Sequence, residues 1–153
     1  DRKKFPPLNL PPMEAKVKRA SEQIQIFDRF RKKFIVLTPE EWVRQHFAHY
    51  LLSHKMVPES ALMLESEIKY GKVRKRPDIS VVNMNNSIWL VVELKASDVA
   101  IDENVWQQAL TYGSVLKPKY IGLSNGLTHI FSEFRPELNK YVFINDLPEF
   151  TVS

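Results

Sequence analysis

The sequence predicts an α/β fold in which a mixed central β-sheet is flanked by helices. In the strand predicted at 87–95, residues 88–92 are all apolar, which is typical of a central strand covered on both faces. A helix is predicted from Asp102 to about Leu116, and another strand follows at 119–123. Because a strand, a crossover helix and a strand form a right-handed parallel unit, the sheet should contain a parallel pair.

The chain divides into an N-terminal arm and one domain. Two Pro-Pro pairs near the start indicate an extended arm at residues 1–22 that could wrap the domain or a partner. The chain of 153 residues, with 44% apolar content, supports one well-buried core, so residues 23–153 are interpreted as a single domain. Residues 23–37 read as two strands around a polar connection. Its basic residues, Arg31, Lys32 and Lys33, favour a solvated turn.

A helix should begin directly after Thr38. Thr38 is a good N-cap, Pro39 occupies the first helical position and Glu41 occupies the capping-box position. His46 and His49 could share a metal, but no third ligand follows at convincing spacing, so we interpret them as surface or packing residues. The predicted core face of the helix consists of Val43, Phe47, Tyr50, Leu51 and His54.

A strand is predicted at residues 61–70, and a strongly basic loop follows it. Glu65 and Glu67 share one face of this strand, either exposed at an edge or facing the next hairpin. The net charge of +4 slightly favours nucleic-acid binding. The basic loop leads into Asp78, where a phosphate backbone would approach, although a solvated loop would look the same. Its basic residues are Lys69, Lys72, Arg74, Lys75 and Arg76.

Residues 78–84 and 87–95 are predicted to form a β-hairpin about a tight turn at 85–86. A two-residue loop there sets Asp78 directly opposite Glu93, whereas a three-residue loop or a bulge would spoil this register. Opposed side chains on one face of a hairpin lie about 5 Å apart, where like charges repel. The two carboxylates therefore require a cation.

Two cations satisfy this requirement, and the spacing leaves both open. Lys95 lies two residues beyond Glu93 and points to the same face, so an ion cluster of Asp78, Glu93 and Lys95 needs no metal. The alternative is a magnesium site, because Mg²⁺ prefers hard carboxylate oxygens and retains several waters. Such a site suits phosphodiester cleavage, with a nearby lysine stabilising the developing negative charge.

The C-terminal third supplies the remaining elements. Gln108 and Tyr112 are four residues apart on the predicted second helix and share one face of it. The dipeptide Asn125-Gly126 indicates a type I′ turn into a strand at 127–134. Residues 141–144 are expected to add a last edge strand.

Several motifs together resemble a known family. Arg76-Pro77-Asp78, followed by Glu93-Leu94-Lys95, resembles the PD-(D/E)XK nuclease superfamily, and the context is similar to the N-terminal nuclease domain of type I restriction enzyme R subunits. The resemblance spans about residues 38–134, which would form the core of the domain. Its supporting segments are Thr38-Pro39-Glu40-Glu41, the run from Gln108 to Tyr112, and Ser124-Asn125-Gly126.

The resemblance implies a restriction-endonuclease-like fold with an α-β-β-β-α-β core and a Mg²⁺-dependent deoxyribonuclease activity, with Mn²⁺ as a substitute. The catalytic residues would be Asp78, Glu93, Lys95 and Glu41, and Asp78 and Glu93 would bind the metal. Glu41 or Glu65 would complete the shell, with Glu40 as an alternative because it lies nearer the apolar face of its helix. Gln108 and Tyr112 would support Lys95 or the DNA. The charge pattern adds Arg74, Lys75 and Arg76 as nucleic-acid contacts.

Further expectations concern partners and location. The chain has only four glycines and no phosphate-binding glycine motif, so we expect no nucleotide cofactor. It has no cysteine, no signal-peptide pattern and no long apolar run, which predicts a cytoplasmic protein without a membrane span. DNA is the expected partner, and a homodimer or a partner subunit stays open. The enzyme would be an endonuclease of restriction or DNA-processing type; the alternative is a non-catalytic nucleic-acid-binding or protein-interaction module of the same fold.

Overall fold

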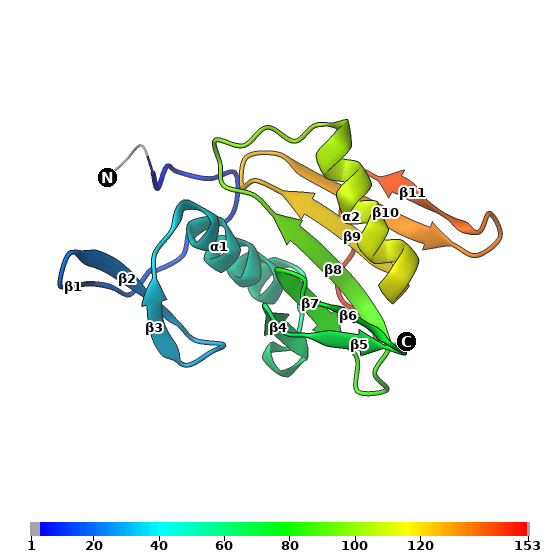
Figure 1. The fold of residues 1–153 in the computed structure, drawn as a ribbon, viewed down its shortest axis with the longest axis horizontal. Helices are drawn as coiled ribbons and strands as arrows, with labels where there is room; N and C mark the ends of the chain where they lie inside the picture. The colour runs from blue at the N-terminus through cyan, green and yellow to red at the C-terminus, as the bar shows by residue number, and fades with distance from the viewer. Residues whose placement is uncertain (1–3, 153) are drawn as a thin grey trace.

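The structure is a computed structural model that describes residues 4–152. Within this range a six-stranded sheet forms the centre of the molecule (Figure 1). Its strands are β4 (Leu62–Leu64), β7 (Ile79–Val82), β8 (Ile88–Leu94), β9 (Tyr120–Ser124), β10 (His129–Arg135) and β11 (Lys140–Ile144). The strand order is β11-β10-β9-β8-β7-β4, with β8 and β9 parallel and the other neighbours antiparallel. The predicted α/β class and the parallel unit are confirmed.

Both predicted helices form with their predicted caps. Helix α1 (Pro39–His54) begins after Thr38, whose hydroxyl accepts a hydrogen bond from the Glu41 backbone N–H at 3.0 Å. Helix α2 (Glu103–Leu116) begins after Asp102, whose carboxylate accepts from the Val105 N–H at 2.9 Å. Each cap satisfies a backbone donor that the helix itself leaves unpaired, which fixes where the helix begins.

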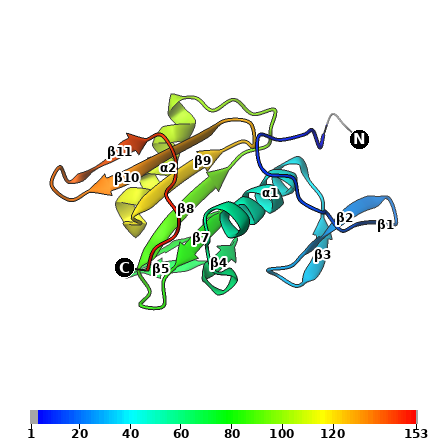
Figure 2. The same cartoon turned by 180° about the vertical axis from the view of Figure 1, so that it is seen from behind.

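The helices cover opposite faces of the sheet, so the protein has two hydrophobic clusters. On one face, Phe47 of α1 is fully buried in a cluster that includes Leu90 and Val92 of β8. On the other face, Trp106 of α2 packs against Ile121 of β9. The N-terminal arm and the C-terminal segment lie over the α1 side (Figure 2), where they extend the larger cluster. None of the helices within residues 4–152 is long and apolar enough to cross a membrane.

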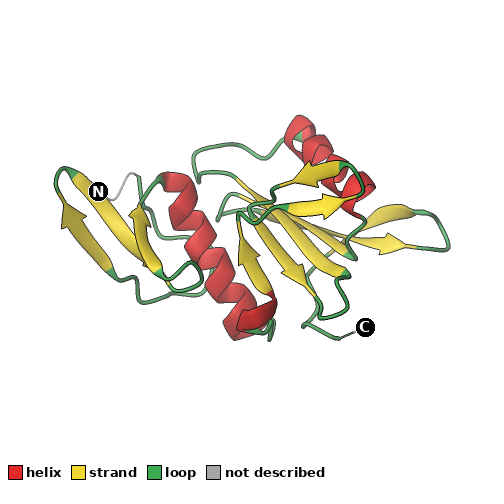
Figure 3. Cartoon of the chain, turned by 60° about the horizontal axis from the view of Figure 1, so that its bottom comes forward, coloured by secondary structure: helices red, strands yellow, loops and turns green. Residues whose placement is uncertain are grey.

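A second, three-stranded sheet lies on the far side of α1 (Figure 3). Its strands are β1 (Val17–Ala20), β2 (Gln23–Asp28) and β3 (Lys33–Val36). The two strands predicted at 23–37 are confirmed, whereas β1 was not predicted and lies inside the segment assigned to the arm. Residues 1–3 of the arm lie outside the described residues. From residue 4 to β1 the arm packs on the domain: the Trp42 indole donates to the Pro6 carbonyl at 2.8 Å, and the Asn9 N–H donates to the Gly126 carbonyl at 2.8 Å.

The β7–β8 hairpin closes differently from the prediction. The Asn83 N–H donates to the Ser87 carbonyl at 2.8 Å, so the loop has three residues rather than the predicted two at 85–86. Asn86 adopts a positive φ of 66°, and its N–H donates to the Asn83 carbonyl at 2.9 Å. A three-residue loop with its last residue in the left-handed region is a common hairpin closure, and asparagine tolerates that conformation.

A bulge in β8 nevertheless restores the predicted register at the other end of the hairpin. The pairing shifts by one residue next to Val82, which leaves Trp89 as the extra residue. Beyond the shift, Ile79 pairs with Val92 as predicted. The loop and the bulge shift the register in opposite directions, so their effects cancel. Asp78 directly precedes Ile79 and Glu93 directly follows Val92, so the two acids come next to each other at this end of the hairpin.

The single strand predicted at 61–70 is interrupted after Leu64, and its last residues, 68–70, form a strand of another sheet. Glu65 has a positive φ of 50°, which turns the chain out of the sheet. The basic segment that follows is a separate hairpin of β5 (Ile68–Tyr70) and β6 (Val73–Lys75) rather than a loop. Gly71, at φ 62°, occupies its turn, where the missing side chain removes the steric penalty.

The predicted type I′ turn at Asn125-Gly126 is also wrong. Ser124 pairs with His129, so four residues connect β9 to β10. The Asn125 side-chain oxygen accepts from the N–H groups of Leu127 and Thr128 at 3.0 and 2.9 Å. The asparagine therefore stabilises the loop through its side chain and not through a left-handed backbone.

Candidate active site

The structure brings the predicted acids together where β7 begins and β8 ends. The carboxylate of Asp78 accepts a hydrogen bond from the Leu94 N–H at 2.8 Å, which ties it to β8 beside Glu93. The backbone carbonyl of Asp78 accepts from the Glu65 N–H at 3.1 Å. Lys95 follows directly and is held by its own N–H, which donates to the Ser124 carbonyl at 2.9 Å. Backbone hydrogen bonds therefore fix the positions of these residues.

Glu93 is the most perturbed group of the site. Its Oε1 atom is buried and has no hydrogen-bond partner among residues 4–152. Burial, followed by the charge of Asp78, raises the pKa of Glu93 to about 8, and the charge of Lys95 opposes this shift. A carboxyl with this pKa keeps its proton at neutral pH, so the Asp78–Glu93 pair carries less than its full negative charge.

Glu40, Lys95 and Tyr112 surround the pair. Burial and then the charge of Asp78 raise the pKa of Glu40, and the charges of Arg44 and Lys95 oppose the rise. Burial and then the charge of Glu93 raise the pKa of Tyr112. These mutual effects place an acid of α1 and a phenol of α2 within electrostatic reach of the pair.

Glu41, which was predicted to be catalytic, lies within a cluster of buried donors. Arg31 donates to both of its carboxylate oxygens at 3.0 and 2.9 Å, Arg44 donates at 2.5 Å, and the Gln45 amide donates at 3.0 Å. These bonds fully occupy the carboxylate. The acid of α1 that faces Asp78 is therefore Glu40, the alternative noted from the helical wheel.

Arg44 was not predicted, and it is central to the site. Its side chain is 4% exposed, and its guanidinium lies 2.9 Å from the Asp78 carboxylate and 3.0 Å from that of Glu65. It also donates to Glu40 at 3.1 Å. The sequence carried one signal for it, because Arg44 is spaced four residues from Glu40 and three from Glu41 on one helix.

The interpretation of Arg31 as part of a solvated turn is wrong. The side chain is only 21% exposed. It pairs with Asp28, with Glu41 and, at 3.3 Å, with Glu65. Arg31 thereby joins the three-stranded sheet to α1 and to the turn after β4, and Glu65 becomes an arginine partner on the rim of the site.

The predicted nucleic-acid residues lie around the same end of the sheet. Lys75 places its ammonium 5.8 Å from the centroid of the Tyr112 ring. Arg74 lies 3.8 Å from the Glu67 carboxylate, whereas Arg76 donates to the Glu65 backbone carbonyl at 2.6 Å. Gln108 is exposed one turn before Tyr112 on α2. The hairpin β5–β6 and the helix α2 together present these groups.

The carboxylates of the site suit a metal ion that takes only one or two protein ligands. No group of three or more His, Cys, Asp or Glu side chains that could hold a metal lies within residues 4–152. Mg²⁺, however, is commonly bound by one or two carboxylates together with waters and substrate phosphates. Asp78 and Glu93 could supply those carboxylates, and the unpartnered Glu93 Oε1 is a suitable ligand atom. His46 instead donates from Nδ1 to the Trp42 carbonyl at 2.8 Å, as a packing residue.

Comparison with known proteins assigns the family. Residues 39–148 match the family model described as type I restriction enzyme R protein N terminus. The chain belongs to this family. The match covers α1, the six-stranded sheet and α2, whereas the three-stranded sheet of this R-protein N-terminal domain lies before the matched range.

A solved structure supports the fold. It is a fragment assigned to the HsdR subunit of a type I restriction enzyme from Vibrio vulnificus YJ016, 18% identical, with a TM-score of 0.51. The similarity covers 72% of this chain and 23% of that chain, so the R-protein N-terminal domain spans about a quarter of the length of its structural relative. No curated protein matches the chain. These findings support a restriction-related role.

Proposed function

We propose that this domain is a metal-dependent nuclease of the PD-(D/E)XK type that hydrolyses phosphodiester bonds of DNA. The observation that carries the proposal is the buried, unpartnered Oε1 of Glu93 beside Asp78. Glu93 lies beside Asp78 and keeps its proton until the pH is about 8. A divalent cation would complete this site, because it would neutralise both carboxylates once the proton is lost. Perturbed carboxyls of this kind gather at functional sites.

Each residue then has a role. Bound Mg²⁺, or Mn²⁺ in its place, would polarise the phosphate and lower the pKa of a coordinated water. Asp78 and Glu93 would hold the ion, which would require Glu93 to release its proton. Lys95 neutralises negative charge that develops on the phosphate. Tyr112 and Glu40 border the pair and limit the access of solvent to it.

The surroundings of the site suit a polyanionic substrate. The hairpin β5–β6 presents exposed basic side chains beside α2, and their charge attracts a phosphate backbone. Its similarity to part of an HsdR subunit supports the proposal that the domain would act on DNA within an assembly of subunits. DNA recognition by such an assembly could come from partner subunits.

A specific observation favours a second candidate, a non-catalytic nucleic-acid-binding module. Arg44 already neutralises one oxygen of Asp78 at 2.9 Å, and the Leu94 N–H binds the other at 2.8 Å. With these partners the acids are stable without a metal. In this alternative the basic hairpin binds DNA and the acid cluster serves only to join α1, β7 and the turn after β4.

Cleavage of supercoiled plasmid and of labelled single strands tests the proposal. The wild-type domain is incubated with Mg²⁺ or Mn²⁺ beside Asp78→Asn and Lys95→Ala, and Glu22→Gln on the exposed β1–β2 turn is the matched control. We expect cutting that requires metal and falls by a factor of about 100 to 1,000 in both site variants. A folded wild type that binds DNA and cuts none of these substrates would favour the second candidate.

A further inference from the structure

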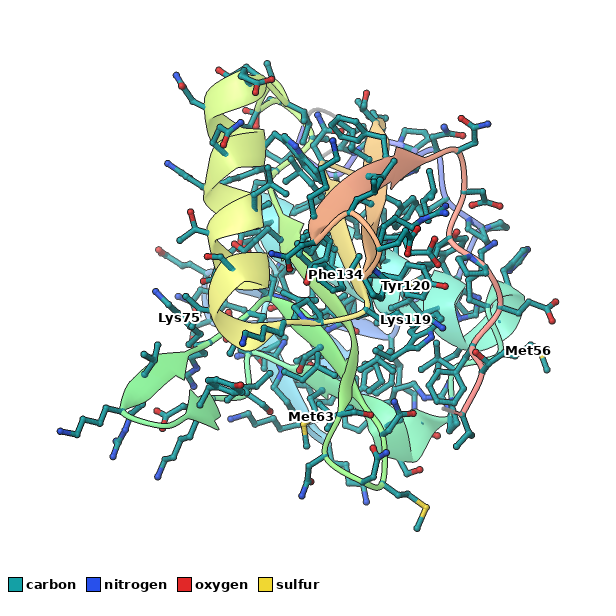
Figure 4. The ribbon with its side chains drawn as sticks, turned by 90° about the vertical axis from the view of Figure 1, so that its right-hand side faces the viewer. Met56, Met63, Lys75, Lys119, Tyr120 and Phe134 are labelled. Atoms are coloured by element: carbon teal, nitrogen blue, oxygen red, sulfur yellow. The ribbon has the colours of Figure 1, made fainter. Side chains whose placement is uncertain are left out.

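A cavity of about 770 Å³ lies at the opposite end of β8 from the acids. It is bordered by Ile88 and Trp89 at the start of β8, by Lys119 before β9, and by the ends of α2 and β10. Figure 4 shows Lys119 and Phe134 close together at this end of the sheet, with the hairpin β5–β6 beside the same end of α2. The volume is that of a typical small-ligand site.

The charge of the cavity wall favours an anionic ligand. Four basic residues line it, Lys69, Lys117, Lys119 and Arg135, against Glu133 and Glu137. The three lysines have no ion pair within residues 4–152, whereas Arg135 lies 2.8 Å from the Glu133 carboxylate. Their positive charge is therefore available to a ligand and not already neutralised by the protein.

The same wall offers an exposed aromatic ring. Tyr70 is 50% exposed, and the ammonium of Lys117 lies 5.8 Å from the centroid of its ring. Trp89 and Asn83, both more than nine-tenths buried, also line the cavity, and each has a polar atom without a hydrogen-bond partner in the described chain, Nε1 and Oδ1. Their burial leaves the exposed ring of Tyr70 as the group of the wall that can stack on a base.

The basic hairpin connects this cavity to the acids. Strand β5 contributes Tyr70 to the cavity, and strand β6 contributes Lys75, which lies over Tyr112 next to Glu93. From Trp89 to Glu93 the strand β8 extends about 13 Å, at about 3.3 Å per residue. A single strand of a few nucleotides therefore spans the distance from the cavity to the acids.

We propose that this cavity binds an unpaired, single-stranded segment of the nucleic-acid substrate, a few nucleotides from the bond that is cut. Exposed aromatic rings bind unpaired bases by stacking, and lysines bind the phosphates between them. A duplex keeps its bases stacked on one another and offers no free face to Tyr70. The cavity therefore favours single strands over duplexes. The position relative to the cut rests on the proposed function, whereas binding itself does not.

Fluorescence anisotropy of labelled oligo(dT), oligo(rU) and a duplex, measured in EDTA, tests the proposal without requiring cleavage. We expect the single strands to bind more tightly than the duplex. Tyr70→Ala should weaken single-strand binding between about fivefold and about a hundredfold, and Tyr70→Phe should retain it, because stacking needs the ring and not the hydroxyl. Similar binding of DNA and RNA strands, or of DNA alone, would both support the cavity as a single-strand site.

Lys119→Ala and Phe143→Ala complete the experiment. Lys119→Ala should reduce the slope of log K against log salt by about 0.7, the value for the loss of one phosphate contact to a single strand. Phe143, 63% exposed and packed on Trp106 away from the cavity, is the matched aromatic control and should not change binding. Equal binding of duplex and single strands, or no loss in Tyr70→Ala, would overturn the proposal. Absence of cleavage would affect only the nuclease assignment.

Discussion

Replacing Glu93 with glutamine is expected to remove a pH dependence from the free energy of unfolding. In the folded protein, burial and the charge of Asp78 raise the pKa of Glu93 to about 8, from an ordinary value of 4.5. The folded state therefore binds more protons than the unfolded state between these values. The stability contributed by Glu93 is complete below pH 4.5 and is lost as pH rises through about 8.

The size of this effect follows from the difference between the ordinary pKa of 4.5 and the folded-state pKa of about 8. One proton contributes about 1.36 kcal/mol per pH unit, so the interval gives an upper limit of about 4 to 5 kcal/mol. Because Glu93 is only partly buried, solvent screening reduces the value, and we expect about 2 to 4 kcal/mol. Glutamine has nearly the same size and does not ionise. The variant should therefore gain stability relative to the wild type as pH rises from 4.5 to about 8.

Urea denaturation followed by circular dichroism, across that pH interval, measures the difference. Glu22→Gln, an exposed change on the β1–β2 turn, should follow the wild-type profile. At the alkaline end, Mg²⁺ should stabilise the wild type more than Glu93→Gln, because a bound ion favours the native state. Parallel pH profiles for the wild type and Glu93→Gln would refute the assignment of a buried, protonated carboxyl to this position.

Further predictions concern stability. Arg44→Met should cost about 3 to 5 kcal/mol in urea denaturation, because it leaves buried carboxylates without their cation; a loss under about 1 kcal/mol would contradict this. Thr38→Ala should cost about 1 kcal/mol through the lost N-cap, and Thr38→Ser should retain most of the stability. Gly113→Ala should lower the melting temperature, at a cost of about 1 to 3 kcal/mol, because the new methyl group overlaps Ile121 and presses on the Tyr141 ring. An unchanged melting temperature would show that this packing adapts.

Features governed by neighbours in sequence could be predicted. The caps at Thr38 and Asp102 act over three residues, so both helix starts follow from the local sequence. The alignment of Asp78 with Glu93 was also predicted, but through a loop that does not form. The three-residue loop and the bulge at Trp89 compensate each other, and neither has a signal that distinguishes it from a regular two-residue turn.

Features governed by long side chains from distant elements could not be predicted. Arg31 comes from the β2–β3 turn and Arg44 from α1, yet both reach Glu65, which lies 34 and 21 residues further along the chain. The choice between Glu40 and Glu41 depends on which carboxylate these arginines occupy. Sequence periodicity places both acids near the same helix end. Arg31 reaches Glu41 only because the three-stranded sheet lies beside α1.

Asp78 connects the arginine cluster to Glu93, and this connection bears on how a metal would bind. One Asp78 oxygen accepts from Arg44 and the other from the Leu94 N–H. Each carboxylate oxygen has two lone pairs, so an ion can bind Asp78 without breaking either bond. The positive charge of Arg44 nevertheless offsets part of the negative charge of the Asp78–Glu93 pair, and the proton on Glu93 reduces that negative charge further. Cation affinity should therefore be weak below pH about 8 and should rise as Glu93 deprotonates. A substrate phosphate, as an additional ligand of the ion, would strengthen binding and favour occupation of the site when nucleic acid is present.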